Sequence, residues 1–141
     1  TTSNKAVATV DAAGKVTVKG PGVVKITVKA AATTDYKAAS KTVTVTVAPK
    51  KQSISLVNKI KKQLTIKWKK NTKASGYQVV YSTNKKFTGK KTVRKAKTTT
   101  SYKIKGLKKG EKYYVKVRSY KTVNGKRIYG AYSTAKKATI K

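Results

Sequence analysis

The chain lacks cysteine, methionine and histidine, and only three of its 141 residues, Asp11, Asp35 and Glu111, are acidic. Without cysteine there are no disulfides and no thiolate chemistry, and without histidine the commonest metal ligand and acid–base group is missing. Three scattered acids supply neither the paired carboxylates of a hydrolytic site nor the clustered oxygen ligands that calcium needs. The sequence therefore predicts a chain that is not an enzyme and that binds no cofactor and no metal.

Long apolar runs are also absent. No stretch reaches the length of a membrane span, and no signal peptide or sorting motif is recognisable. The chain begins at Thr1 in the middle of a sequence pattern, so we expect it to be a fragment of a longer polypeptide. Any catalytic domain is then expected upstream, among further domains of the same polypeptide.

Positive charge is what the chain has in excess, with 36 lysines and arginines and a formal net charge of +33. Residues 1–48 hold seven lysines and two aspartates, a net charge of +5, which leaves +28 for the remainder. Only Arg94, Arg118 and Arg127 are arginines. Lysine is a hydrated point charge suited to diffuse attraction, whereas the arginine fork serves specific phosphate or base recognition. Broad affinity for polyanions is therefore predicted in preference to sequence-specific recognition.

The first third of the chain alternates small and β-branched residues in a pattern typical of strands. The expected strands are 6–10, 16–19, 23–28 and 42–47. Turn signals at 11–14 and 20–22 separate them, and residues 30–40 are expected to form an extended loop. Four strands are too few for an immunoglobulin-like sandwich of about seven. The first domain, residues 1–48, is thus expected to be incomplete at its N-terminus and completed by upstream strands or by another chain.

Residues 49–51 are expected to form a linker, because Pro49 cannot donate a hydrogen bond to a β-ladder. A second domain, residues 52–141, follows with regularly spaced strands that predict another sandwich. Its expected strands are 53–57, 63–69, 76–82, 91–94, 101–105, 112–120 and 127–140, the last with a break. Its expected core is Leu64, Ile66, Trp68, Tyr77, Val79, Tyr81, Tyr102, Ile104, Leu107, Tyr113, Val115 and Val117.

The most informative stretch of the second domain is 107–117, where a glycine-containing turn runs directly into an alternating strand. Tyr113 and Val115 share the inward face of that strand, while Tyr114 and Lys116 share the outward face. A leucine, a glycine corner and a tyrosine that opens an inward-facing strand are typical of a tyrosine corner. We therefore expect the Tyr113 hydroxyl to bond back to the preceding backbone.

The segments 64–68, 76–81, 107–117 and 129–133 together resemble a fibronectin type III domain over about residues 52–141. Lys109 departs from the family pattern, which usually carries proline at that corner. Residues 3–18 and 20–28 resemble the C-terminal half of a group-2 bacterial immunoglobulin-like domain over about residues 1–48.

This resemblance implies an all-β chain of two immunoglobulin-like β-sandwich modules in tandem. It also implies a secreted or cell-surface protein of Gram-positive bacteria, located outside the cell.

Tyrosines and cations alternate on the outward face of strand 112–120, and more of them are expected beside it. The candidate polyanion-binding residues are Lys103, Lys105, Tyr114, Lys116, Arg118, Tyr120, Arg127 and Tyr129. Aromatic rings beside cations can stack on sugars or bases, or can simply cover the sheet or the preceding domain. If the functional interpretation holds, charge reversal on this face weakens polyanion binding and leaves the melting temperature nearly unchanged.

The leading hypothesis is a non-catalytic C-terminal spacer and adhesion module of a larger protein. Its lysine-rich surface is expected to bind anionic polysaccharide of the cell wall or of a host, such as teichoic acid, glycosaminoglycan or mucin glycan. The alternatives are nonspecific binding of extracellular nucleic acid and a pure spacer without a ligand.

Overall fold

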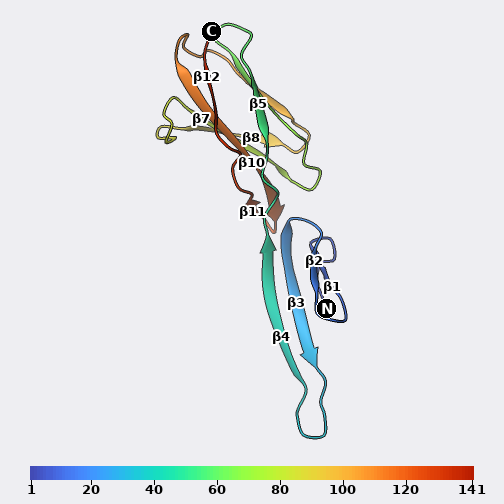
Figure 1. The fold of residues 1–141 in the computed structure, drawn as a ribbon. Helices are drawn as coiled ribbons and strands as arrows, with labels where there is room; N and C mark the ends of the chain where they lie inside the picture. The colour runs from blue at the N-terminus through green and yellow to red at the C-terminus, as the bar shows by residue number, and fades with distance from the viewer.

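The computed structural model describes residues 1–141 and consists of strands and connecting turns. It contains no helix that could cross a membrane. Two β-sheet modules lie end to end, with the N-terminus in the first and the C-terminus at the far end of the second (Figure 1). The long β3–β4 hairpin of the first module points away from the second, so only one end of each module faces the other (Figure 1).

The first module consists of two antiparallel hairpins. They are formed by β1 (Ala8–Val10) with β2 (Val16–Val18), and by β3 (Gly22–Ala30) with β4 (Ala39–Val47). The carboxylate of Asp11 accepts a 2.8 Å bond from the Lys15 amide, which closes the first turn as its sequence predicts. The expected loop at 30–40 is shorter than predicted, because the alternating pattern keeps β3 and β4 paired as far as Ala30 and Ala39.

The core of the first module is small. Val7, Ala8 and Val24 are its buried members, and Val45 and Val47 pack against them. Other apolar side chains of the same strands face solvent, with Val28 65% and Val43 50% exposed. The four strands of the first module therefore bury only a small part of their apolar side chains.

The second module is a sandwich of two sheets that pack their inner faces together. One sheet has the order β5-β6-β9, and the other has the order β11-β10-β7-β8 with β12 also paired to β10. The strands are β5 (Ile54–Val57), β6 (Leu64–Trp68), β7 (Gly76–Ser82), β8 (Lys91–Ala96), β9 (Ser101–Ile104), β10 (Lys112–Val123), β11 (Lys126–Tyr129) and β12 (Lys136–Thr139). This arrangement confirms the all-β sandwich that the alternation predicted.

The core of the second module is nearly the one expected from the sequence. Its twelve buried residues are Ile54, Leu64, Ile66, Trp68, Tyr77, Val79, Tyr81, Ile104, Leu107, Val115, Val117 and Ile140. Tyr102 and Tyr113 pack against this cluster but are only partly buried. Burial raises the pKa of Tyr81 above its ordinary value, and neighbouring Tyr102 and Tyr113 add to the rise.

Backbone hydrogen bonds, rather than a bond from the Tyr113 hydroxyl, hold the turn before β10. The Gly110 amide donates to the Ile140 carbonyl at 2.9 Å, and the Ile140 amide donates to the Glu111 carbonyl at 3.0 Å. The Tyr113 hydroxyl forms none of the side-chain hydrogen bonds in this region, so the expected bond of a tyrosine corner is not made. Ile140, directly after the last strand, supplies the partners instead, and sequence spacing does not place it against this turn.

Strand β10 extends three residues past its expected end at Tyr120 and turns back into β11. Asn124 and Gly125, with φ of 48° and 74°, form the two-residue turn between the two strands. An asparagine–glycine pair is a strong hairpin signal, because both central residues of such a turn need positive φ. The sequence therefore contained the information for this hairpin.

Candidate polyanion-binding surface

The structure brings six of the eight candidate residues together. They are Tyr114, Lys116, Arg118 and Tyr120 on the outward face of β10, and Arg127 and Tyr129 on neighbouring β11. Lys103 and Lys105 lie on and just after β9, in the other sheet of the sandwich. Because Ile104 between them is in the core, these two lysines face outward on the opposite side of the module.

Aromatic rings enclose the outward cations of β10. The Lys116 Nζ lies 4.1 Å from the ring centre of Phe87 and 4.5 Å from that of Tyr132. The Arg118 Cζ lies 4.3 Å from the ring centre of Tyr132 and 3.8 Å from that of Tyr129. Tyr132 is thus shared between two cations, and each cation has a ring on either side.

The stack continues toward the first module. The rings of Tyr120 and Tyr129 are 5.8 Å apart, and the Arg127 Cζ lies 5.5 Å from the Tyr120 ring centre. We call the whole series the aromatic–cation ladder. Its members are Phe87, Lys116, Tyr132, Arg118, Tyr129, Tyr120 and Arg127.

Gln78 on β7 anchors the middle of the ladder. Its Oε1 accepts a 2.7 Å bond from the Arg118 Nε and a 3.0 Å bond from the Tyr132 hydroxyl. Gln78 lies directly opposite Arg118 in the β7–β10 pairing, so the bond to the arginine crosses from one strand to the next. One amide oxygen therefore fixes both the guanidinium and the ring that stacks on it.

Two connecting segments carry the other two rings of the ladder: Tyr132 lies between β11 and β12, and Phe87 lies between β7 and β8. The Ser133 hydroxyl accepts a 3.0 Å bond from the Val117 amide, and the Ser133 amide donates to the Val117 carbonyl at 2.7 Å. This pairing holds Tyr132 over the outer face of β10. Phe87, in the β7–β8 loop with φ of 61°, is only 8% exposed. Sequence reasoning missed Phe87 and Gln78, because neither lies in an alternating run of cations and aromatics.

The ladder changes what the outward face of β10 is expected to do. Lys116 and Arg118 are half-buried, and their charges already have rings or an amide oxygen as partners. Reversing either charge would therefore lower the free energy of unfolding, contrary to the expectation that the melting temperature would hardly change. The geometry favours the interpretation in which these tyrosines cover the sheet.

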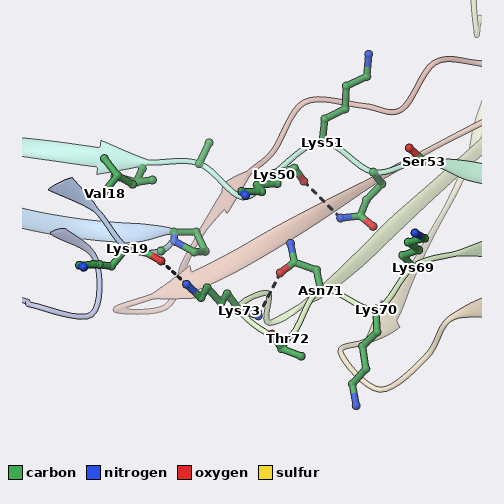
Figure 2. A pocket seen from close by; sticks show the side chains of 15 residues that line it. Val18, Lys19, Lys50, Lys51, Ser53, Lys69, Lys70, Asn71, Thr72 and Lys73 are labelled. Atoms are coloured by element: carbon green, nitrogen blue, oxygen red, sulfur yellow. Dashed lines mark hydrogen bonds between the residues drawn. The ribbon is translucent and has the colours of Figure 1, made fainter.

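A second cationic surface lies where the two modules meet. It is a cleft of about 560 Å³, lined by residues of the β2–β3 connection, of the linker and of the β6–β7 loop (Figure 2). Six lysines line it, all of them exposed: Lys19, Lys50, Lys51, Lys69, Lys70 and Lys73. No carboxylate lines the cleft.

Direct contacts between the modules and the linker define this cleft. The Lys73 Nζ donates to the Lys19 carbonyl, which joins the β6–β7 loop to the first module (Figure 2). The Lys50 carbonyl accepts a 3.2 Å bond from the Ser119 hydroxyl, so the linker is attached to β10. None of the six lysines was a sequence candidate. The available signal in the sequence was the position of two lysine doublets: residues 50–51 lie in the expected linker, and residues 69–70 lie at the end of an expected strand.

Comparison with known families identifies both modules. A family model of the fibronectin type III domain matches residues 47–135. The chain belongs to the fibronectin type III family. A model of the intimin immunoglobulin-like domain matches residues 1–33, ahead of the fibronectin type III module. The two resemblances drawn from the sequence are thus confirmed as a fibronectin type III domain that follows an immunoglobulin-like one.

Solved structures agree on the fold. The sixth fibronectin type III domain of human fibronectin type III domain containing protein 3 has a TM-score of 0.55 at 15% identity, over 68% of this chain and 88% of that one. The fibronectin type III domain of the human collagen alpha-1(XX) chain has a TM-score of 0.51 at 15% identity, over 63% and 82%. At such identities these similarities show the fold alone.

A Kelch domain-containing protein of Sulfurisphaera tokodaii is 35% identical over 85 residues, which are 60% of this chain and 11% of that protein. The chain therefore spans about a tenth of the length of this curated relative. The fibronectin type III fold is typically non-catalytic, and the two module types suggest a structural or adhesion role. The intimin-type match suggests a surface-exposed protein.

Proposed function

We propose that this chain is a non-catalytic spacer and adhesion module of a larger secreted or cell-surface bacterial protein, and that its lysine-rich surface binds anionic polymers. The observation that carries the proposal is the distribution of charge. The fibronectin type III module and the linker hold a net charge of +28, and their one acid is Glu111. Such an excess far exceeds what solubility requires of a small domain.

The kind of cation supports a broad rather than a specific interaction. Of the 36 cations, 33 are lysines, and two of the three arginines, Arg118 and Arg127, stack on rings of the ladder. Lysine provides attraction without the fixed geometry of a guanidinium fork. At physiological salt the Debye length is about 8 Å, so neighbouring lysines reinforce one another's field. A polymer with many negative charges suits this surface.

The ligands that fit are anionic polysaccharides outside the cell, either a teichoic-acid-like wall polymer or a host glycosaminoglycan or mucin glycan. The immunoglobulin-like match supports the surface location. Extracellular nucleic acid is less favoured, because the aromatic rings that would stack on bases are occupied within the ladder.

Retention of the chain on immobilised heparin and on purified bacterial cell walls, across a salt gradient, tests the proposal. We expect retention at low salt and elution as salt rises, with an uncharged matrix as the control. No retention on either material at low salt would overturn polyanion binding. Undiminished wall retention after acetylation of the lysines would favour a spacer held by other contacts.

A further inference from the structure

We propose that the lysine-lined cleft between the two modules is the principal binding site for a sulfate- or phosphate-bearing polysaccharide, which contacts both modules at once. The inference rests on the proposed function and assigns it a location. It moves the site away from the outward face of β10, where the sequence placed it, to residues 19–20, 50–53 and 69–73.

No acidic residue lies near the lysines of the cleft. All three acids of the chain lie at ends of elements that point away from the junction between the modules. Asp11 is in the β1–β2 turn, Asp35 is in the loop at the tip of the β3–β4 hairpin, and Glu111 precedes β10 at the far end of its module. The six ammonium groups of the cleft are therefore not neutralised within the chain.

The cleft is concave and elongated by the directions of its lysine side chains. A concave site lined by one sign of charge concentrates its field more than a flat surface does. The lysine side chains fan out along the cleft rather than converging on one point: Lys51 and Lys70 point in opposite directions (Figure 2). This arrangement fits charges spaced along a polymer better than it fits a single small anion.

The lining of the cleft combines lysines with small polar residues. It contains no aromatic residue and no arginine, so it offers neither a stacking platform nor a bidentate fork for bases. Beside the lysines it presents small polar groups, among them Ser53, Asn71 and Thr72, which suit sugar hydroxyls. Its volume of about 560 Å³ lies within the range of pockets that hold ligands. A charged glycan is favoured over nucleic acid.

Both modules and the linker contribute lysines to the cleft. Lys19 belongs to the first module, Lys50 and Lys51 to the linker, and the other three lysines to the second module. Lys73 already bonds across the junction to the Lys19 carbonyl. A polymer held by lysines of both modules would add contacts across the same junction and restrict motion between them.

Two matched variants of the full chain test this site. The cleft variant replaces two lysine doublets with glutamine: Lys50→Gln, Lys51→Gln, Lys69→Gln and Lys70→Gln. The control makes the same charge change with two exposed doublets in the β7–β8 loop and at the start of β8: Lys85→Gln, Lys86→Gln, Lys90→Gln and Lys91→Gln. All eight side chains are exposed, so we expect both variants to fold, as checked by Trp68 fluorescence.

The measurement is the Kd of each protein for a size-defined heparin fragment and for poly(glycerol phosphate), at several salt concentrations. We expect the cleft variant to bind at least about tenfold more weakly than the control variant. Its dependence of log Kd on log salt should also be shallower, since each lost ion contact lowers that slope by roughly 0.7–0.9. Inorganic phosphate at the same charge concentration should compete poorly. The polymer with the larger difference between variants identifies the source of the anionic groups.

Equal losses in the two variants would overturn the cleft while leaving the proposed function standing, because diffuse charge would then explain binding. Absence of binding by the parent chain to both polymers would remove the proposed function as well. Tighter binding of the parent chain to single-stranded DNA of matched charge, with the same loss in the cleft variant, would overturn the choice of a polysaccharide.

Discussion

The sharpest prediction concerns Arg118, because the structure gives it a stabilising role where the sequence suggested a binding role. Its guanidinium lies between the rings of Tyr129 and Tyr132, at 3.8 and 4.3 Å, and its Nε bonds to Gln78 at 2.7 Å. A half-buried cation–π contact contributes about 1 kcal/mol, and a hydrogen bond to a charged group contributes about 1.5–3 kcal/mol. Because these contacts share partners, their sum is an upper limit.

We therefore expect Arg118→Ala to lower the free energy of unfolding by about 2–4 kcal/mol. For a module of this size such a loss corresponds to a fall in melting temperature of roughly 10–25 °C. Arg118→Lys keeps the charge but loses the planar fork and the bond to Gln78, so its cost should be intermediate.

Urea unfolding followed by the fluorescence of Trp68 measures these losses. Trp68 is the single tryptophan and lies in the core of the fibronectin type III module, so it reports on that module alone. Arg127→Ala is the matched control, because it removes the same charge from an exposed residue with one ring contact at 5.5 Å. If Arg118→Ala shifts the unfolding midpoint no more than Arg127→Ala does, the close ring contacts of Arg118 and its bond to Gln78 do not stabilise the sheet.

Two further predictions concern the linker and pH. A Cβ at residue 130 would clash with the Pro49 carbonyl oxygen, so Gly130→Ala should displace the linker and cost about 1–3 kcal/mol by overpacking. Ala131→Ser, at the exposed next residue, should cost little in the same urea assay. Because the pKa of Tyr81 is raised in the folded chain, its contribution to stability is complete below pH 10 and is lost as pH rises through the folded value. Tyr81→Phe should therefore lose less stability than the parent chain over that range, as measured by unfolding midpoints on either side of pH 10, and an equal loss would contradict the assignment.

Most of the fold could be predicted because strand alternation and burial are local signals. Leu64, Ile66 and Trp68 alternate with polar residues on one strand, and all three are in the core. What escaped prediction depended on contacts distant in sequence. The Tyr113 hydroxyl was expected to close its own corner, but backbone groups of Ile140 in the last segment close it instead. No local pattern indicates which terminal segment lies beside a given turn.

The candidate site was harder to predict for a related reason. Lysine doublets occur throughout the chain from residue 50 onward, at 50–51, 61–62, 69–70, 85–86, 90–91, 108–109 and 136–137. Composition cannot tell which of them share a surface. The fold places 50–51 and 69–70 at one cleft together with Lys19, and it places Lys103 and Lys105 on the opposite face from Tyr114 and Lys116.

The three arginines of the chain lie where their planar side chains can contact the outer face of one sheet. Arg118 and Arg127 stack on rings, and Arg94 on β8 lies opposite Gln78 of β7 in the strand register, so all three lie on one face of the sheet. Arginine offers a planar, weakly hydrated guanidinium that can stack flat on a ring, whereas lysine offers a compact, strongly hydrated ammonium. The six cations of the cleft are all lysines, which keep their hydration and their mobility. The ladder and the cleft thus use their cations differently: Arg118, Arg127 and Lys116 contact rings of the sheet, whereas the cleft lysines lie in a lining without aromatic residues and are available to a polymer. If this difference in role is correct, replacing the three arginines by lysine should lower the free energy of unfolding and leave polymer affinity nearly unchanged. The cleft variant should instead lose polymer affinity and keep nearly the same free energy of unfolding.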